Sequence, residues 1–246
     1  MSHHKIDIKD LDYMYPDGKK AVNGFSINIT HGESVALVGA NGAGKSTLLS
    51  LMVGILMPQK GEIIIGDTHL SKETLPLLRQ KIGMTFQNAD DQLFMNSVYE
   101  DVAFGPRNYK LNEEEVDARV IGALKKVDAL HLKDRPPYKL SGGEKRAVSI
   151  ATALSLDPDI LLMDEPTAAL DPKSRRRLIG ILKEFAHTKI IATHDLDMAL
   201  DVCDRTIVMN QGTVVADGRT KDIMVNDELL EKCSLERPLI LQGQNN

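Results

Sequence analysis

The sequence lacks the features of several protein classes. No apolar run among its 246 residues approaches the roughly 18 that a helix needs to cross a bilayer, so we expect no membrane span in the chain itself. The net charge of −5 provides no overall positive field to attract nucleic acid. Only two cysteines occur, Cys203 and Cys233. They have no metal-ligand spacing and follow no secretory segment, which predicts ordinary thiols in a reducing, cytosolic compartment.

Hydrophobic patterning predicts an α/β protein. The first thirty residues alternate around the turn PDGK and predict antiparallel strands. Three apolar runs, VALVG (35–39), DILLMD (159–164) and TKIIAT (188–193), predict a parallel sheet covered on both faces. Residues 95–155 are mostly helical in pattern, including a helix after Asn112, its expected N-cap. TIVMNQGTVVADG predicts a further hairpin, followed by a polar helix that ends at Pro238.

The segment GANGAGKST (39–47) fits the phosphate-loop pattern G-x-x-x-x-G-K-[ST]. The glycines allow backbone N–H groups to turn toward phosphates, Lys45 reaches the terminal phosphates, and the Ser46 hydroxyl suits magnesium. A predicted strand precedes the loop and a predicted helix follows it, which indicates nucleotide binding.

ILLMDEP (160–166) places two carboxylates at the end of a buried strand. Asp164 is expected to hold magnesium through water, and Glu165 to polarise an attacking water molecule. The alternative is that both acids merely begin a turn before Pro166.

LSGGEKR (140–146) combines a helix cap with two unexpected glycines. Ser141 and Glu144 form the pattern of a capping box. A cap does not explain Gly142 and Gly143, because each glycine costs up to about 1 kcal/mol relative to alanine in a helix. Their bare N–H groups indicate a second phosphate-binding surface, which a second copy of the chain could bring to the nucleotide.

With the phosphate loop before it and ILLMDE after it, LSGGE resembles the nucleotide-binding subunit of ATP-binding cassette (ABC) transporters. The resemblance implies a single ABC ATPase domain over residues 1–246. Its P-loop NTPase (RecA-like) core, with an N-terminal antiparallel β subdomain, would comprise 1–94 and 156–246, and an α-helical subdomain, 95–155, would be inserted. It also implies ATP and Mg²⁺ as cofactors, and a head-to-tail dimer with itself or with a paralogous ATPase.

The resemblance assigns roles residue by residue. Catalytic roles fall to Lys45, Gln87, Glu165 and His194, and magnesium to Ser46, Gln87 and Asp164. Contacts with ATP fall to Tyr15, Asn41, Gly42, Ala43, Gly44, Lys45, Ser46 and Thr47, and, from the opposite subunit, to Ser141, Gly142, Gly143 and Asp171. Tyr13 is the rival of Tyr15 for stacking on adenine, and a tyrosine packed on the core is the alternative. The family more often has serine where Ala168 stands.

The implied activity is ATP hydrolysis coupled to transport. DNA-repair and translation ATPases share the cassette, but their usual long coiled coil, zinc insertion or second cassette is not visible here. We therefore expect a peripheral subunit at the cytoplasmic face of a membrane importer, with no nucleic-acid partner. A soluble ABC ATPase that acts on nucleic acid or ribosomes is the alternative.

QNADDQLF (87–94), together with VYEDVAFGPRN downstream, resembles the energy-coupling factor (ECF) branch, whose ATPases drive cobalt, nickel or vitamin uptake. In that branch the segment after the glutamine helps to receive a coupling helix of the transmembrane subunit, while the substrate-binding membrane subunit is engaged indirectly. Leu93 and Phe94 would form an apolar floor, and Asp90 or Asp91 would complement a basic helix. A metal site at the two acids and a plain acidic turn are the alternatives. The short tail favours a cobalt or nickel system with one ATPase over a vitamin system such as a biotin importer.

Overall fold

The computed structural model describes residues 5–242. Residues 1–4 and 243–246, which the single-domain prediction included, lie outside the described residues. The described residues form two compact units, one of residues 5–79 and 187–242 and the other of residues 80–186. The predicted helical subdomain, 95–155, lies within the second unit, which also contains β6 (Ile82–Thr85) and β7 (Ile160–Asp164) because these two strands pair in parallel. The predicted boundaries at 94 and 156 therefore remain a prediction.

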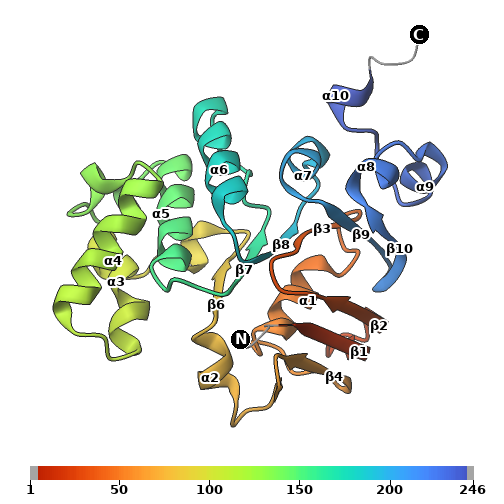
Figure 1. Cartoon of the computed structure of the whole chain (residues 1–246), viewed down its shortest axis with the longest axis horizontal. Coiled ribbons are helices and arrows are strands. Elements are labelled where there is room, and N and C mark those ends of the chain that lie inside the picture. The colour runs from red at the N-terminus through yellow and green to blue at the C-terminus, as the bar shows by residue number, and fades with distance from the viewer. Residues whose placement is uncertain (1–4, 243–246) are drawn as a thin grey trace. The chain divides into compact units, whose positions relative to one another are not determined.

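The first unit contains two groups of strands (Figure 1). The antiparallel group has the order β2-β1-β4-β5, and the second group has the neighbouring order β10-β9-β3-β8. The strands are β1 (Ile6–Met14), β2 (Lys20–Ile29), β3 (Ser34–Val38), β4 (Lys60–Ile65), β5 (Thr68–His69), β8 (Thr188–Ala192), β9 (Arg205–Asn210) and β10 (Thr213–Arg219). β3 pairs in parallel with both β8 and β9, as its buried apolar sequence predicts, whereas β9 and β10 form the predicted antiparallel hairpin.

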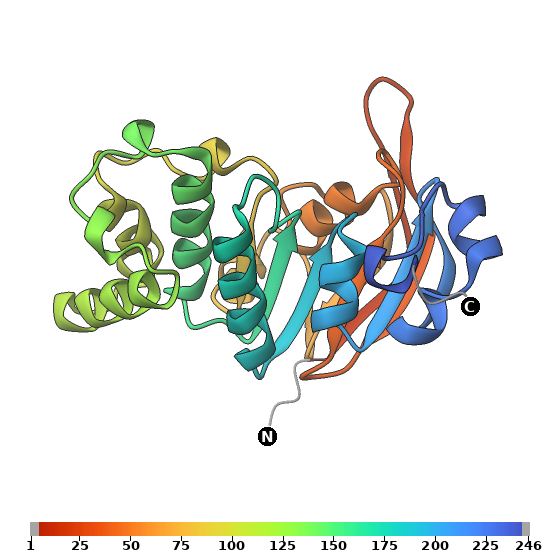
Figure 2. The same ribbon diagram turned by 90° about the horizontal axis from the view of Figure 1, so that it is seen from above.

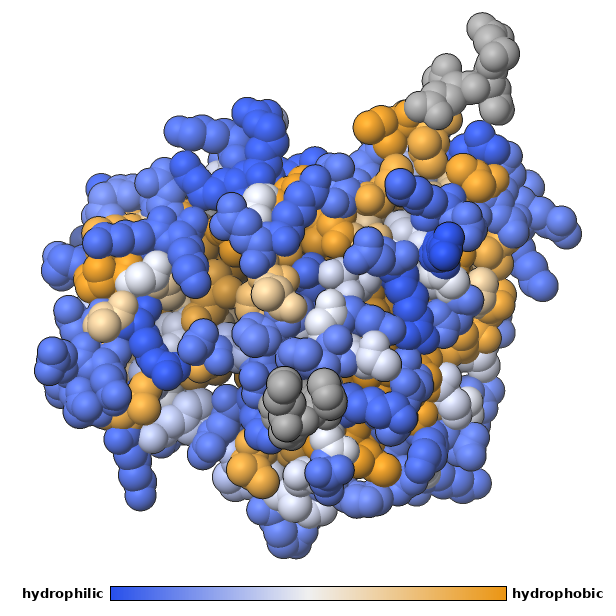
Figure 3. All heavy atoms as spheres, viewed as in Figure 1, coloured by the Kyte–Doolittle hydropathy of each residue, from blue (hydrophilic) through white to orange (hydrophobic). Residues whose placement is uncertain are grey.

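Six short helices complete the described part of the first unit. They are α1 (Lys45–Met52), α2 (Leu75–Arg79), α7 (Leu196–Val202), α8 (Thr220–Ile223), α9 (Asp227–Lys232) and α10 (Leu239–Gln242). The polar helix predicted before Pro238 ends earlier, at Lys232, and Ser234 has a positive φ of 55°. The chain resumes as α10, where the Leu239 and Ile240 side chains are 74% and 64% exposed. Figure 3 shows apolar surface over this helix.

The second unit is built largely of helices. These are α3 (Val98–Asn108), α4 (Glu113–Lys126), α5 (Gly142–Leu154) and α6 (Pro172–Glu184), and a 3-10 turn spans Ala89–Asp91. Helices α3, α4 and α5 pack against one another, as Figures 1 and 2 show. Their contact buries the apolar stripe of α4, including Val116, Val120 and Leu124.

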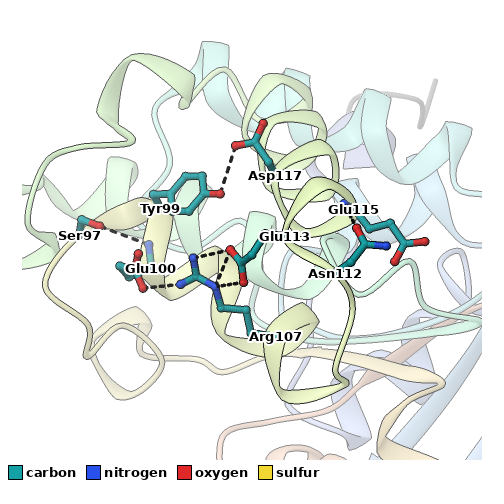
Figure 4. Close-up of polar contacts among 8 residues, drawn as sticks. All are labelled: Ser97, Tyr99, Glu100, Arg107, Asn112, Glu113, Glu115 and Asp117. Carbon is teal, nitrogen blue, oxygen red and sulfur yellow. Dashed lines mark hydrogen bonds and ion pairs between the residues drawn. The ribbon is translucent and has the colours of Figure 1, made fainter.

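The junction of α3 and α4 is fixed by caps and ion pairs (Figure 4). Asn112 caps α4 as predicted, accepting the Glu115 N–H at 2.9 Å. Arg107, near the end of α3, donates to Glu100 at 2.7 Å and to Glu113 at 2.9 Å. The Tyr99 hydroxyl donates to Asp117 at 3.1 Å. The turn between these helices is thus held at several points, which fixes the direction of α3.

Among residues 5–242, no helix combines the length and the apolar character that a bilayer span requires.

Candidate functional site

The phosphate loop connects β3 to α1 in the first unit. Backbone atoms come so close to two of its glycines that no larger residue fits. A Cβ on Gly39 would lie 2.3 Å from the Met209 carbonyl oxygen, and one on Gly44 would lie 2.2 Å from that of Ala21. These contacts give a structural reason for both glycines of the motif and leave a cradle lined by backbone, as phosphate binding requires.

Lys45 is a buried cation at the start of α1. Its side chain is 6% exposed, and its ammonium donates to the carbonyl oxygens of Gly39 at 2.7 Å and Ala40 at 3.2 Å. The Lys45 ammonium therefore lies against the phosphate loop, which precedes Lys45 in the sequence. Ser46 is exposed in the first turn of α1, whereas Thr47 is buried.

Tyr15 lies beside this loop. Its hydroxyl is 3.0 Å from the Thr47 hydroxyl oxygen, a distance at which either can donate. Tyr13 packs edge-on against Tyr15, with ring centroids 5.1 Å apart. Tyr15 thus contacts the phosphate-loop segment directly, and Tyr13 packs against Tyr15. Sequence reasoning missed Lys19, whose ammonium lies 3.8 Å from where a Cβ on Gly42 would stand.

His194 follows β8 at the same edge of the first unit as the phosphate loop. β3 and β8 run in parallel, so the residues after them meet at their carboxyl ends. The Thr193 N–H donates to the Leu37 carbonyl at 3.1 Å, which ties this turn to the strand that leads into the loop. His194 itself is exposed, and Asp195 caps α7 by accepting the Met198 N–H at 2.9 Å.

The second unit carries the two carboxylates that end β7. Asp164 and Glu165 are only 4% and 5% exposed. Glu165 has a φ of 47°, a left-handed conformation that is uncommon for a residue with a side chain. The Ala168 N–H donates to the Glu165 carbonyl at 3.1 Å and closes the turn. A strained, buried carboxylate at a strand end is typical of a functional position, and it argues against an ordinary surface turn.

The LSGGEKR segment begins α5 with the predicted capping box. Ser141 accepts the Glu144 N–H, and the Glu144 carboxylate accepts the Ser141 N–H at 2.8 Å. The Ser141 N–H and then the Ser141 hydroxyl, which both donate to the Glu144 carboxylate at 2.8 Å, hold the pKa of Glu144 below its usual value. A Cβ on Gly142 would meet no atom within 4 Å, so the protein itself does not demand a glycine there. That freedom is consistent with a glycine retained for the approach of a ligand.

Asp171 has a local role within the chain. Its carboxylate caps α6 by accepting the N–H groups of Lys173 at 2.8 Å and Ser174 at 3.1 Å. The Ser174 hydroxyl donates to it at 2.5 Å, and the pKa of Asp171 is lowered, chiefly by this bond. The predicted contact of Asp171 with an opposite subunit remains a prediction.

Gln87 is held through its backbone by a residue that sequence reasoning missed. Arg146, on α5, is 4% exposed and donates to the carbonyl oxygens of Phe86, at 2.6 Å, and of Gln87. Burial lowers the pKa of Arg146, and the charges of Asp164 and Glu165 oppose this shift. The Gln87 side chain is exposed. The residues EKR in the motif indicate a cation at position 146, but they do not indicate which groups it binds.

The QNADDQLF segment divides into buried and exposed residues. The prediction that Leu93 is part of an exposed apolar floor is wrong, because this side chain is buried, at 8% exposed. Phe94 is 64% exposed, and its contact with a partner remains a prediction. The Phe94 ring packs edge-on against Phe104 of α3 at a centroid distance of 5.1 Å. Asp90 is not simply a free surface charge, because Lys145 pairs with it at 2.5 Å.

Asp101, on α3, anchors the backbone of this segment and was also missed. Its Oδ1 accepts the N–H groups of Phe94 at 2.9 Å and Met95 at 3.0 Å. Burial raises the pKa of Asp101, and these two bonds oppose the rise. Within residues 5–242, no group of three or more His, Cys, Asp or Glu side chains is placed to hold a metal ion, Asp90 and Asp91 included.

Comparison with known proteins decides the family. Residues 22–168 match the ABC transporter family model. The chain belongs to the ABC transporter ATPase family. Its enzymatic activity is ATP hydrolysis coupled to transport, and the ABC ATPase fold predicted from the motifs is confirmed.

Individual relatives carry ABC transporter names, and one is named for the predicted branch. A Geobacter sulfurreducens protein, named as an ABC transporter ATP-binding protein, is 57% identical over 99% of this chain and 98% of its own length. An energy-coupling factor transporter ATP-binding protein, EcfA, of Methanothermobacter thermautotrophicus is 44% identical over 95% of this chain and 76% of its own. The solved structure of cbiO1 from Clostridium perfringens, part of the ABC transporter complex cbiONQ, is 41% identical, with a TM-score of 0.79 and 97% of each chain covered. The resemblance to the ECF branch is thereby confirmed.

The predicted ABC site residues fall into two groups. Tyr15, the phosphate loop and His194 lie in the first unit, at or near the carboxyl end of β3. Gln87, Asp164, Glu165 and the LSGGE segment lie in the second unit. Each group is supported internally by the hydrogen bonds described above, and the role of each residue toward ATP is a proposal.

Proposed function

We propose that the chain is the ATPase subunit of an ECF-type importer, at the cytoplasmic face of a membrane, that moves cobalt or nickel ions. One observation carries the assignment to a membrane partner: the exposed pair Phe94 and Phe104, beside the segment that begins with Gln87. Similarity to cbiO1, part of an ABC transporter complex, and to an energy-coupling factor ATPase supports the branch. The sequence resemblance supports cobalt or nickel.

In this proposal, different residues bind the phosphates, bind adenine and orient the attacking water. Lys45 and the backbone N–H groups of the phosphate loop neutralise the phosphates, and Tyr15 stacks on adenine. Glu165 orients the attacking water and His194 supports the terminal phosphate. Burial of Glu165 and its left-handed backbone provide a fixed orientation. Little covalent chemistry is needed, because phosphoryl transfer depends mainly on position and charge.

The residues that would hold Mg²⁺ fit that ion chemically. Ser46, Gln87 and Asp164 offer hydroxyl, amide and carboxylate oxygens, which are the hard ligands that Mg²⁺ prefers. When bound with ATP, the ion neutralises charge on the phosphate oxygens.

ABC ATPases dimerise and pair with membrane components. In the proposed dimer, Ser141, Gly142 and Gly143 of one subunit contact the γ-phosphate held by the other, and Asp171 links the two sites. The partner is a second copy of this chain or a paralogous ATPase. The capping box of α5 uses the N–H groups of Ser141 and Glu144, and those of Gly142 and Gly143 between them suit an anion.

The surface around Phe94 suits a transmembrane coupling subunit. Aromatic side chains that are rigidly held and exposed are typical anchors of protein interfaces. Asp101 fixes the Phe94 backbone, and the Arg107 ion pairs brace α3, the helix that carries Phe104. Asp91 adds negative charge to the same segment, whereas the charge of Asp90 is paired with Lys145. A partner helix with an apolar face and basic residues would complement this surface.

The proposal is tested by purifying the chain from detergent-solubilised membranes of its own cells and identifying integral membrane proteins in the complex. The reconstituted complex is then assayed for ATP-dependent uptake. We expect uptake of Co²⁺ or Ni²⁺. Uptake of biotin or another vitamin instead would replace the substrate assignment. Recovery of ribosomes or nucleic acid without a membrane subunit would contradict the transport proposal.

Phe94→Ala tests the docking surface. We expect it to weaken assembly with the membrane subunit by about 10-fold or more, as loss of an aromatic anchor does, while ATP binding by the isolated chain stays within about twofold. Val225→Ala, at a side chain that is 51% exposed in the first unit, is the control and should assemble normally. Loss of ATP binding with normal assembly would place Phe94 outside the docking surface.

A further inference from the structure

The segment that follows β6 is tied to α5 at three points, all within the second unit. Arg146 holds the carbonyls of Phe86 and Gln87 at its start. At its end the Gln92 amide donates to the Ser149 carbonyl at 3.0 Å and the Thr152 hydroxyl at 2.5 Å. Between them, Lys145 pairs with Asp90 at 2.5 Å. Arg146 and Gln92, at the two ends of the segment, bind backbone carbonyls or a partly buried hydroxyl. Lys145 and Asp90, in the middle, form an ion pair near the surface.

The position of Lys145 is unfavourable without its partner. It lies in the first turn of α5, with its N–H bonded to the Ser141 carbonyl at 2.9 Å. The positive end of the helix dipole disfavours a cation there. Asp90 supplies the compensating negative charge, and the Lys145 side chain is 20% exposed against 63% for Asp90. Lys145, on the helix, is therefore the mostly buried member of the pair, and Asp90, on the loop, is the member that solvent reaches.

The pair also stands between two groups of functional residues. Asp90 follows Gln87 by three residues and is fixed locally because its N–H donates to the Asn88 side chain at 3.2 Å. Lys145 follows Gly143 by two residues in the same turn as the capping box. The ion pair thus joins the Asp90 turn directly to the helix turn that follows the LSGGE glycines.

We propose that Lys145 is a positioning residue whose ion pair with Asp90 couples the partner-facing segment 87–94 to the first turn of α5. The inference rests on the proposed function, in which that segment receives the membrane subunit and α5 meets ATP. It assigns Asp90 to the internal link rather than to direct recognition of a basic partner helix, and leaves Asp91 for that contact.

A charge exchange tests the link in the isolated chain. Amide hydrogen exchange is measured for residues 88–92 and 141–145 in wild type, Lys145→Glu, Asp90→Lys and the double variant. We expect each single variant to raise exchange about two- to fivefold in both segments, the range for loss of a partly exposed ion pair, and the double variant to restore it. Asp91→Lys, a reversal on the neighbouring residue, is the control and should leave residues 141–145 unchanged. Failure of the double variant to restore exchange would overturn the inference.

The second measurement is the stimulation of ATPase activity by the membrane subunit in the reconstituted complex. Lys145→Glu should reduce stimulation about two- to fivefold, whereas Lys145→Arg and the double variant should retain it. Restored exchange without restored stimulation would also overturn the inference. If wild type itself binds no membrane subunit, the proposed function fails, while hydrogen exchange still decides whether the internal link exists.

Discussion

Lys45 and Arg146 are two buried cations that both bind main-chain carbonyls, but their partners lie at very different distances along the sequence. The Lys45 side chain is 6% exposed and Arg146 is 4% exposed, and both donate to main-chain carbonyls. Lys45 binds carbonyls five and six residues back in its own loop. Arg146 binds carbonyls 59 and 60 residues away. A local contact shapes the loop that a ligand meets, whereas a distant one sets where a separate strand ends and the functional segment begins.

The difference separates residues that meet ATP from residues that position others. Lys45 is suited to phosphate because its ammonium is a compact charge with three N–H donors on a flexible stem, and it lies at the phosphate loop. Arg146 uses the planar fork of its guanidinium to bind two successive carbonyls, a geometry that lysine cannot reproduce. Loss of the first should affect ATP directly, and loss of the second should affect the placement of Gln87.

The largest expected effect concerns a local, motif-defined residue. Glu165→Gln keeps the size of the side chain and removes the carboxylate that orients water. We expect kcat to fall about 10²- to 10⁴-fold, as loss of a general base does, while ATP still binds and dimers accumulate. Steady-state hydrolysis, ATP binding and size-exclusion chromatography measure the three effects. Near-normal turnover would remove Glu165 from its proposed role.

Arg146 should give an intermediate effect of a different kind. Arg146→Met leaves two carbonyls without their charged donor, so we expect the free energy of unfolding to fall by about 2–3 kcal/mol. kcat should fall with little change in the KM for ATP, and amide exchange after β6 should rise. Arg146→Lys should recover part of the stability but not the positions of both carbonyls. Urea unfolding and initial rates measure these effects. A selective loss of ATP affinity would instead place Arg146 against the nucleotide.

The sequence predicted the features that depend on neighbours along the chain. The parallel strands, the β9–β10 hairpin, the Asn112 cap and the Ser141 capping box were all predicted and all occur. The hydrogen bond from Arg146 to the Gln87 carbonyl and the one from the Phe94 N–H to Asp101 could not be predicted, because each joins segments that only the fold brings together. Leu93 shows the same limit, since the pattern QNADDQLF did not reveal which apolar residue is buried.

The smallest expected effect belongs to a feature that was read directly from the sequence, the capping box of α5. Hydrogen bonds from the Ser141 backbone N–H and then its hydroxyl lower the folded-state pKa of Glu144 below the ordinary 4.5. The ionised carboxylate therefore stabilises the fold above pH 4.5, and this contribution is lost as the pH falls through the lowered value. Glu144→Gln should show a smaller loss on acidification than wild type. Because the group is partly exposed, the difference in unfolding free energy between pH 6 and pH 3 should stay below about 1 kcal/mol. Urea unfolding of both proteins at the two pH values measures it. A larger difference would mean that Glu144, like Arg146, supports contacts well beyond its own helix turn.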